Sequence, residues 1–258
     1  MNTVVSKLSV RAALSGSISF LADFLKQHWL IVVLYVVVAS AGGFVLKDTD
    51  YLWELPGEKL AQLSLLSIVS AFLAFLMPYY GISMAVGKLD PTAKAFSKGL
   101  WKSLWQLFCV SLLMAIIGTP LLILFLIPGI WWFIKSSVSC VNLLSTDDGP
   151  IASIKKSHEL MNNRFWQCFG FLFLTGLIVF IVNMIITGSV GLCLFVGGLL
   201  HLAFDADTGI NKIANVFRTI GAVISIFTAI IFYYIQAWLY VYLKNNPIGQ
   251  NISIDTSA

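Results

Sequence analysis

Hydrophobic residues form six long runs along the chain, and the polar stretches between them recur in a fixed order. Three times, a segment with basic and apolar residues at helical spacing leads to a tryptophan and then to two apolar runs. The tryptophans are Trp29, Trp105 and Trp166. A helix needs about 20 apolar residues to cross a bilayer, and the runs meet or approach that length. The pattern predicts a repeated unit of one interfacial helix and two spanning helices.

The predicted fold class is an all-α membrane protein, with six transmembrane helices as three hairpins and an amphipathic interfacial helix before each hairpin. Barrel strands are excluded because the apolar runs are continuous rather than alternating. We expect one integral membrane domain over residues 1–258, with pseudo-repeats at about 9–88, 91–148 and 150–244 and a mobile tail over 245–258. The expected spans are 29–46, 60–86, 104–126, 129–146, 166–187 and 219–243.

The connections between these spans differ in length. Residues 127–130, Ile-Pro-Gly-Ile, are predicted to be a minimal turn between the third and fourth spans. Residues 188–218 form a longer connection that contains the glycine-rich apolar segment 190–202. A short re-entrant or interfacial element in that segment is an alternative to a plain loop.

Composition supports lipid as the solvent of this chain. Of the 258 residues, 59% are hydrophobic and only 11% are charged, and the mean hydropathy is +0.89. A soluble domain of this composition would lack the polar residues needed to cover its surface. The net charge of +4 has no clustered arginine and aromatic pattern of the kind that binds nucleic acid, so nucleic acid is not an expected partner.

The distribution of lysine and arginine predicts the orientation, because basic residues are retained on the cytoplasmic side. We expect both termini in the cytoplasm of a bacterial cell and a multi-pass location in the inner membrane. The expected cytoplasmic basic residues are Lys7, Arg11, Lys26, Lys88, Lys94, Lys98, Lys102, Lys155, Lys156, Arg164 and Lys244; Lys47, Lys59, Lys212 and Arg218 fall on the other face, and Lys135 falls inside a span.

No set of residues in the sequence predicts catalysis. The three histidines are far apart in sequence, and His158-Glu159 lacks the second histidine of a zinc-protease motif because position 162 is asparagine. His201, Asp205 and Asp207 could in principle hold a cation, but three such residues in a polar loop more often form a solvated turn. The four cysteines suggest no disulfide framework. We therefore expect no enzyme activity, no metal and no cofactor.

Basic residues beside the spans are the candidate contacts for anionic lipid. In the second unit three lysines recur every four residues, which places them in one stripe on a helix. Their aliphatic stems can lie along lipid while the ammonium groups reach phosphates. The candidates are Lys94, Lys98, Lys102, Lys155, Lys156 and Arg164.

Lys135 is the most informative candidate, because it lies inside the predicted fourth span, about 9 Å from its start by the helical rise. An ionised group at that depth needs water, a carbonyl or a lipid phosphate, and no acidic residue lies in the six predicted spans. Two explanations stay open: the side chain extends to the outer headgroups, or it contacts an anion within the bundle. Asn142 and Asn183 are predicted to be polar residues inside the bundle.

The segments IPGIWWFIKSSVSC and DDGPIASIKKSHELMNNRFWQCF carry a resemblance to an uncharacterised bacterial family of polytopic membrane proteins, related to the membrane domain of glycerophosphodiester phosphodiesterases. In that family a Pro-Gly turn opens a span with a basic residue, and a Gly-Pro begins an amphipathic helix that ends in an aromatic pair. The catalytic domain is absent, so no hydrolase activity is implied. The matching residues are Pro128, Gly129, Lys135, Gly149, Pro150, Glu159, Phe165 and Trp166.

The predicted function is that of a non-enzymatic bacterial inner-membrane protein that binds anionic lipid and acts in envelope or lipid-related homeostasis. The alternative is a transporter or channel for a small solute, with anions among the candidates and a cleft near Lys135. Membrane phospholipids are the expected partners. A homo-oligomer, or association with other membrane proteins, stays open.

Overall fold

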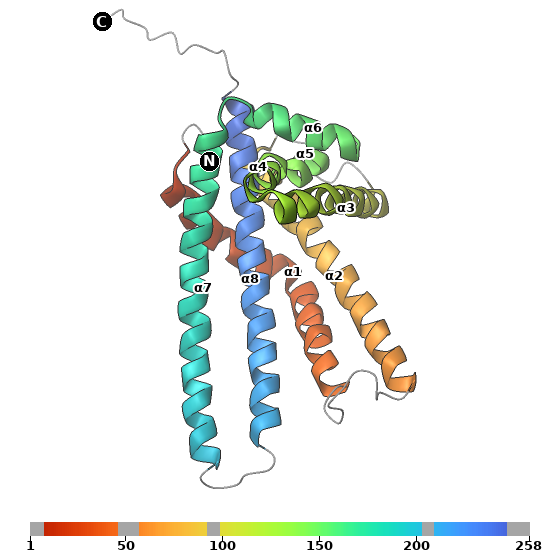
Figure 1. Ribbon diagram of the computed structural model, residues 1–258, viewed down its shortest axis with the longest axis vertical. Helices are drawn as coiled ribbons and strands as arrows, with labels where there is room; N and C mark the ends of the chain where they lie inside the picture. Colours follow the sequence, from red (N-terminus) through yellow and green to blue (C-terminus); the bar gives the residue numbers. More distant parts are fainter. Residues whose placement is uncertain (1–7, 46–56, 92–98, 203–208, 247–258) are drawn as a thin grey trace, which may run out of the picture. The chain divides into compact units, whose positions relative to one another are not determined.

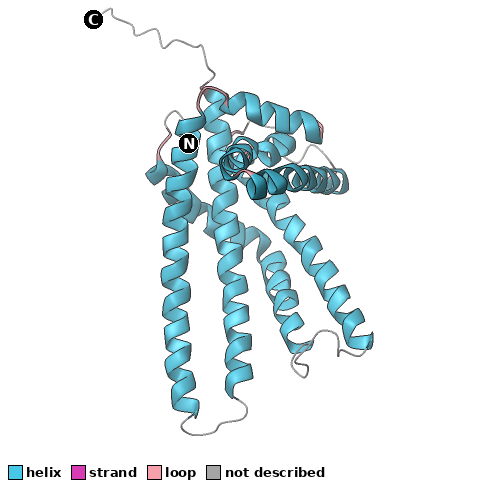
Figure 2. Ribbon diagram, in the orientation of Figure 1, coloured by secondary structure: helices cyan, strands magenta, loops and turns pink. Residues whose placement is uncertain are grey.

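A computed structural model describes residues 8–45, 57–91, 99–202 and 209–246, and in these residues every regular element is a helix (Figures 1 and 2). The helices are α1 Val10–Val45, α2 Gly57–Leu89, α3 Leu100–Leu124, α4 Leu126–Ser136, α5 Ser139–Ser145, α6 Pro150–Met161, α7 Phe165–Leu202 and α8 Gly209–Asn245. The predicted all-α class is confirmed. Lys94, Lys98, Asp205 and Asp207 lie outside the described residues, as does the side chain of His201.

Five of the described helices are long and apolar enough to cross a membrane, which makes this chain an all-helical membrane protein. A helix satisfies its own backbone hydrogen bonds, so it can enter hydrocarbon where other backbone structures cannot. The qualifying segments are Val10–Val38, Gly57–Leu89, Leu100–Leu124, Phe165–Ser189 and Thr219–Asn245.

The prediction of one continuous fourth span over 129–146 is wrong. The structure divides this region into α4, of 11 residues, and α5, of 7 residues, with Ser137 and Val138 between them. Neither helix alone reaches the length that a span requires. Both α4 and α5 nevertheless pack against α3, so the chain does return along α3 after the turn, as a broken helix. The apolar composition indicated the return but not the break.

The turn before α4 also differs from the prediction. The chain reverses at Phe125, whose φ of −144° and ψ of 92° are extended, whereas Pro128 and Gly129 lie in the first turns of α4. Proline suits this place because its missing N–H needs no partner in the first helical turn. Gly129 allows the backbone of α3 to approach closely, since a Cβ there would overlap the Cα atom of Leu122. Gly118 of α3 in turn contacts the ring of Phe133.

Several other boundaries agree with the sequence. The predicted change from interfacial helix to span after residue 28 coincides with a kink in α1, where His28 has φ −124° and ψ 22°. Helix α6 begins at Pro150, the expected first-turn proline, and α7 begins at Phe165, one residue before the predicted start. Helix α7 continues without interruption to Leu202, so residues 190–202 extend this helix instead of forming a separate re-entrant element.

The chain divides into two compact units. Unit 1 comprises residues 1–14, 82–173 and 233–258, and unit 2 comprises residues 15–81 and 174–232. Helices α3 to α6 lie wholly in unit 1, while α1, α2, α7 and α8 each contribute to both units. Neither unit coincides with a predicted pseudo-repeat, and the pseudo-repeats stay a prediction.

In unit 1, Val86 of α2, Leu143 of α5 and Leu239 of α8 are almost completely buried. An ion pair joins the C-terminal ends of α2 and α8. Lys244 Nζ of α8 donates to Oδ2 of Asp90, the residue just after α2, at 2.7 Å. Helix α6 buries Ser153, Ile154, Ser157 and Met161, and it packs against α3, α4 and α5. Its inner face is therefore covered by protein.

Unit 2 buries fewer side chains. Phe20 and Phe24 of α1 are fully buried, and the ring of His28 lies 5.0 Å from that of Phe24 and 4.8 Å from that of Tyr80 in α2. Many large apolar side chains of unit 2 remain exposed on α1, α2 and α7. Exposed aliphatic and aromatic groups on long helices are suited to contact with lipid.

The approach of α4 to α3 generates a prediction. Gly129→Ala should destabilise unit 1 by about 1–3 kcal/mol, the range for overpacking a tight contact, because the obstacle is the backbone of Leu122. The matched control is Gly170→Ala in α7, where a Cβ meets no heavy atom within 4 Å. The thermal unfolding of both variants in the same detergent checks this. An unchanged transition for Gly129→Ala would contradict the close packing of α3 and α4.

Candidate functional site

Lys135 lies in the last turn of α4, inside unit 1, and only 8% of its surface is exposed. The Nζ atom sits 4.1 Å from the centroid of the Trp131 ring, one helical turn earlier, which is a cation–π contact. The same atom is 3.5 Å from Asn162 Oδ1, at the long limit of a hydrogen bond. Lys135 therefore folds back onto its own helix and onto the residue that follows α6.

No carboxylate in the described part of the chain forms an ion pair with Lys135. Its close partners are neutral, although the carbonyl end of α4 provides a partial negative charge that favours a cation in the last turn. Burial of an ammonium group is costly without full hydrogen bonding, and this group carries three N–H donors. The position therefore leaves positive charge available to an anion.

An open groove of about 620 Å³ lies beside this lysine, between α4 and the beginning of α7. On α4, the side chains that line it lie four residues apart along one face, at Ile127, Trp131 and Lys135, with Ile130 beside them. The volume falls within the range of small-molecule sites. The lining residues are Ile127, Ile130, Trp131, Lys135, Asn162, Phe165, Trp166 and Phe169.

The α7 wall of the groove is aromatic. Phe165 and Phe169 stack with ring centroids 6.1 Å apart and an interplanar angle of 18°, and Phe169 stacks on Phe173 at 5.6 Å. Trp166 packs edge-on against both Phe165 and Phe169 and remains 78% exposed. Lys135 and Asn162 are therefore the polar residues of an otherwise hydrocarbon-lined groove.

Hydrogen bonds from α6 hold the end of α4 in place. The Ser157 hydroxyl donates to the backbone carbonyl of Lys135, and Ser136 Oγ lies 3.0 Å from His158 Nε2. The His158 ring also packs edge-on against Trp132, with centroids 4.9 Å apart. These contacts fix the backbone around Lys135 and hence the position of its ammonium group. Ser136 is fully buried, so its contact with His158 does not present a nucleophile to a substrate.

The surroundings of His158 lower the pKa of its imidazole below the ordinary value. Burial is the larger cause, because it disfavours the charged form, and the positive charge of Lys135 adds to it. The neutral imidazole is consequently the form that packs against the ring of Trp132. Any anion that neutralises Lys135 would remove the second of these two effects.

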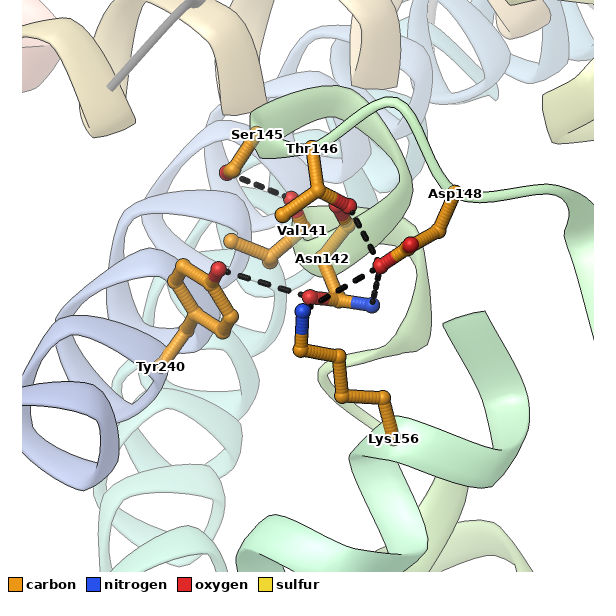
Figure 3. A network of polar contacts seen from close by, with 7 residues as sticks. All are labelled: Val141, Asn142, Ser145, Thr146, Asp148, Lys156 and Tyr240. Carbon is orange, nitrogen blue, oxygen red and sulfur yellow. Dashed lines mark hydrogen bonds and ion pairs between the residues drawn. The ribbon is translucent and has the colours of Figure 1, made fainter. Parts of the chain in front are cut away.

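A second polar cluster in unit 1 is centred on Asn142 of α5 (Figure 3). Asn142 is fully buried; its Nδ2 donates to Asp148 Oδ2 at 3.4 Å, and its Oδ1 accepts from the Tyr240 hydroxyl of α8 at 3.4 Å. Thr146 Oγ1 donates to the same Asp148 oxygen at 2.8 Å. The cluster joins α5 to α8 and orders the turn before α6.

Asp148 accepts a third contact from Lys156 Nζ at 3.3 Å. Its carboxyl pKa is lowered, chiefly by the hydrogen bond from Thr146 and also by the hydrogen bond and charge of Lys156, against the opposing effect of burial. Lys156, which is a predicted lipid contact, forms an ion pair with Asp148. The Asp148 carboxylate already accepts contacts from Asn142, Thr146 and Lys156, so the role of this cluster is structural.

The other described candidate residues are not among those that line the groove. Lys102 and Lys155 are exposed on α3 and α6, and Arg164 is half-buried just before α7. Asn183 belongs to unit 2, where its Nδ2 donates to Thr228 Oγ1 of α8 at 2.7 Å. Of the candidate site residues that the structure describes, only Lys135 lines the groove.

Two residues near Lys135 were not assigned a role from the sequence. Asn162 was treated as part of a helix running to Phe165, but α6 ends at Met161 and Asn163 has a φ of 62°. The Asn162-Asn163 pair could have indicated the end of the helix in the sequence, because asparagine tolerates the left-handed conformation of a turn. In the sequence, His158 begins an incomplete zinc-protease motif, and the described residues contain no group of three or more potential metal-ligating residues.

Comparison of the chain with models of known protein families, with curated protein sequences and with solved structures finds no match. The resemblance to the membrane domain of phosphodiesterases therefore stays a prediction. The fold and the Lys135 groove are the basis for inferring what the protein does.

The lowered pKa of His158 predicts how stability depends on pH. A histidine whose folded pKa lies below its unfolded value, about 6.5, contributes stability above that value, and the contribution is lost as pH falls through it. Wild-type protein should lose more thermal stability between pH 7.5 and 5.5, a window of about one unit either side of that value, than His158→Gln, whose side chain does not titrate. Equal losses of thermal stability in the two proteins would contradict the lowered pKa of His158 as the cause.

Proposed function

We propose that this chain is a non-enzymatic membrane protein of the bacterial inner membrane that binds anionic lipid and acts in envelope or lipid-related homeostasis. One observation carries the proposal: Lys135 is buried beside an open, hydrocarbon-lined groove and has no carboxylate partner in the described part of the chain. An anionic lipid supplies both components that this site lacks, a negative charge for the ammonium group and hydrocarbon for the groove.

The basic surface residues support the same function. On α3, Lys102 is exposed beside the exposed tryptophans Trp101 and Trp105. On α6, Lys155 is exposed beside the exposed apolar residue Ile151. Exposed tryptophan suits the membrane interface, and each lysine near an anionic surface contributes about 1 kcal/mol of attraction. We propose that the amphipathic segments before the apolar runs grip the inner leaflet and that both termini are cytoplasmic.

Transport of a small anionic solute is the second candidate, and the break between α4 and α5 favours it. Discontinuous helices in transporters place helix ends and polar side chains at a substrate site inside the membrane. Lys135 lies at such a helix end. The open, aromatic form of the groove favours lipid over a small hydrophilic solute, which would find only Lys135 and Asn162 as polar lining residues.

The proposed orientation can be tested by labelling in intact cells. With the four native cysteines replaced by alanine, Glu54→Cys should react with an impermeant maleimide, and Lys98→Cys should react only after the membrane is opened. Glu54 lies in the connection predicted to be outside, and Lys98 lies in the interfacial helix predicted to be on the cytoplasmic side. Labelling in the reverse order would contradict cytoplasmic termini.

The function itself can be tested at Lys135. Lys135→Gln should lower the anionic lipid that co-purifies with the protein by about tenfold, the loss expected when a hydrogen bond to a charged group is removed. Lys135→Arg should retain part of it, because the charge is kept. Lipid analysis by mass spectrometry at matched protein amounts measures this, and complementation of a deletion phenotype measures the cellular role.

The matched control is Lys155→Gln, which removes the same charge from an exposed position on α6. Its effect should be small, because exposed lysines contribute additively to a diffuse attraction. Full lipid retention and full complementation by Lys135→Gln would refute the proposal. Loss of complementation with unchanged lipid retention would favour the transporter.

A further inference from the structure

The groove beside Lys135 has a polar end and an apolar end. Lys135 and Asn162 are within 3.5 Å of each other and therefore mark one place. Ile127 lines the groove eight residues earlier on the same face of α4, about 12 Å away by the helical rise. Ile127 is 81% exposed, so the groove is open at that position. A ligand that fills it must be charged at one end and apolar along its length.

Apolar side chains form the two walls of the groove. One face of α4 forms one wall, and the stacked rings of Phe165 and Phe169, together with Trp166, form the other. Flat aromatic rings and branched aliphatic side chains bury methylene groups favourably. The volume of about 620 Å³ suits one drug-sized molecule better than a complete two-chain phospholipid.

The polar end matches a single small anion. The Lys135 ammonium group carries three N–H donors. Its contact with Asn162 Oδ1, at 3.5 Å, is at the long limit of a hydrogen bond, so the N–H in this contact is also available to an anion. The side chain of Asn162 directs its Oδ1 toward Lys135, and the Nδ2 of Asn162 adds amide N–H donors at the polar end of the groove. A carboxylate is acceptor-only and can receive both groups at once. The cation–π contact with Trp131 holds the ammonium group in position for it.

We propose that the Lys135 groove binds an amphiphile with one hydrocarbon chain and one anionic end, of the long-chain carboxylate class. The anion lies on Lys135 and Asn162, and the chain runs between Trp131 and the α7 aromatic stack toward Ile127. The proposal rests on the proposed lipid-binding function and specifies its ligand. It also predicts that the protein distinguishes single-chain anions from the surrounding bilayer lipid.

Photolabelling of the full-length protein in a non-ionic detergent tests the ligand class. The probe is a sixteen-carbon carboxylate, about the span of half a bilayer, with a photoreactive diazirine near the middle of its chain, where it lies beside the groove walls. After illumination, the label should map to peptides that contain residues 127–130 or 165–169. Unlabelled carboxylate of the same length should compete, and the neutral alcohol of that length should not. Labelling confined to other peptides would overturn the proposal.

Two further competitors distinguish the sources of the anion. A single-chain lysophospholipid with a phosphate should compete more weakly than the carboxylate, and phosphatidylglycerol, with two chains, more weakly still. Competition by phosphatidylglycerol equal to that of the carboxylate would refute the single-chain ligand and leave the lipid-binding function standing. Absence of both groove labelling and Lys135-dependent lipid retention would refute both.

Variants locate the two ends of the ligand. Lys135→Gln should lower groove labelling about tenfold or more, and Lys88→Gln, at an exposed position near the end of α2, should leave it unchanged. Ile130→Trp should lower it as well, because the larger ring fills the groove while Lys135 is retained. This second variant keeps the proposal testable if the substitution of Lys135 disturbs folding. Undiminished labelling of either groove variant would overturn the assignment.

Discussion

An ammonium group withdrawn from solvent, with only neutral groups beside it, is the constraint on which the proposed site depends. Lys135 is held by the face of Trp131, the amide of Asn162 and the carbonyl end of α4. These contacts reduce the electrostatic cost of burial but do not remove the charge. The adjacent groove is lined almost entirely by hydrocarbon, so a ligand that satisfies the charge must also be apolar over most of its length.

The packing of unit 1 explains why this lysine stays where it is. Gly129 and Gly118 let α4 lie close against α3, and Ser157 of α6 holds the carbonyl of Lys135 itself. On the far side of the break, Asn142 and Asp148 tie α5 to α8 and to the turn before α6. The interruption at Ser137 and Val138 is thus bounded by two fixed segments, and the helix end it creates supplies a partial negative charge at Lys135.

Much of the helical layout could be predicted from the sequence, because long apolar runs and tryptophan boundaries are local signals. The starts of α6 and α7 and the kink at His28 fall within a residue of the expected places. The break in the fourth apolar run was not predictable from hydropathy, since Lys135 and the serines around it are compatible with either a broken or a continuous helix. The contact with Asn162 depends on tertiary packing of residues 27 positions apart.

A density map of the full-length protein in a bilayer of native lipid extract tests the central claim most directly. The account predicts elongated density in the groove, with one end within hydrogen-bonding distance of Lys135 Nζ and the remainder running between Trp131 and the α7 aromatic stack toward Ile127. A groove filled by ordinary disordered lipid, with Lys135 turned out to water or paired with a carboxylate of the chain, would contradict it.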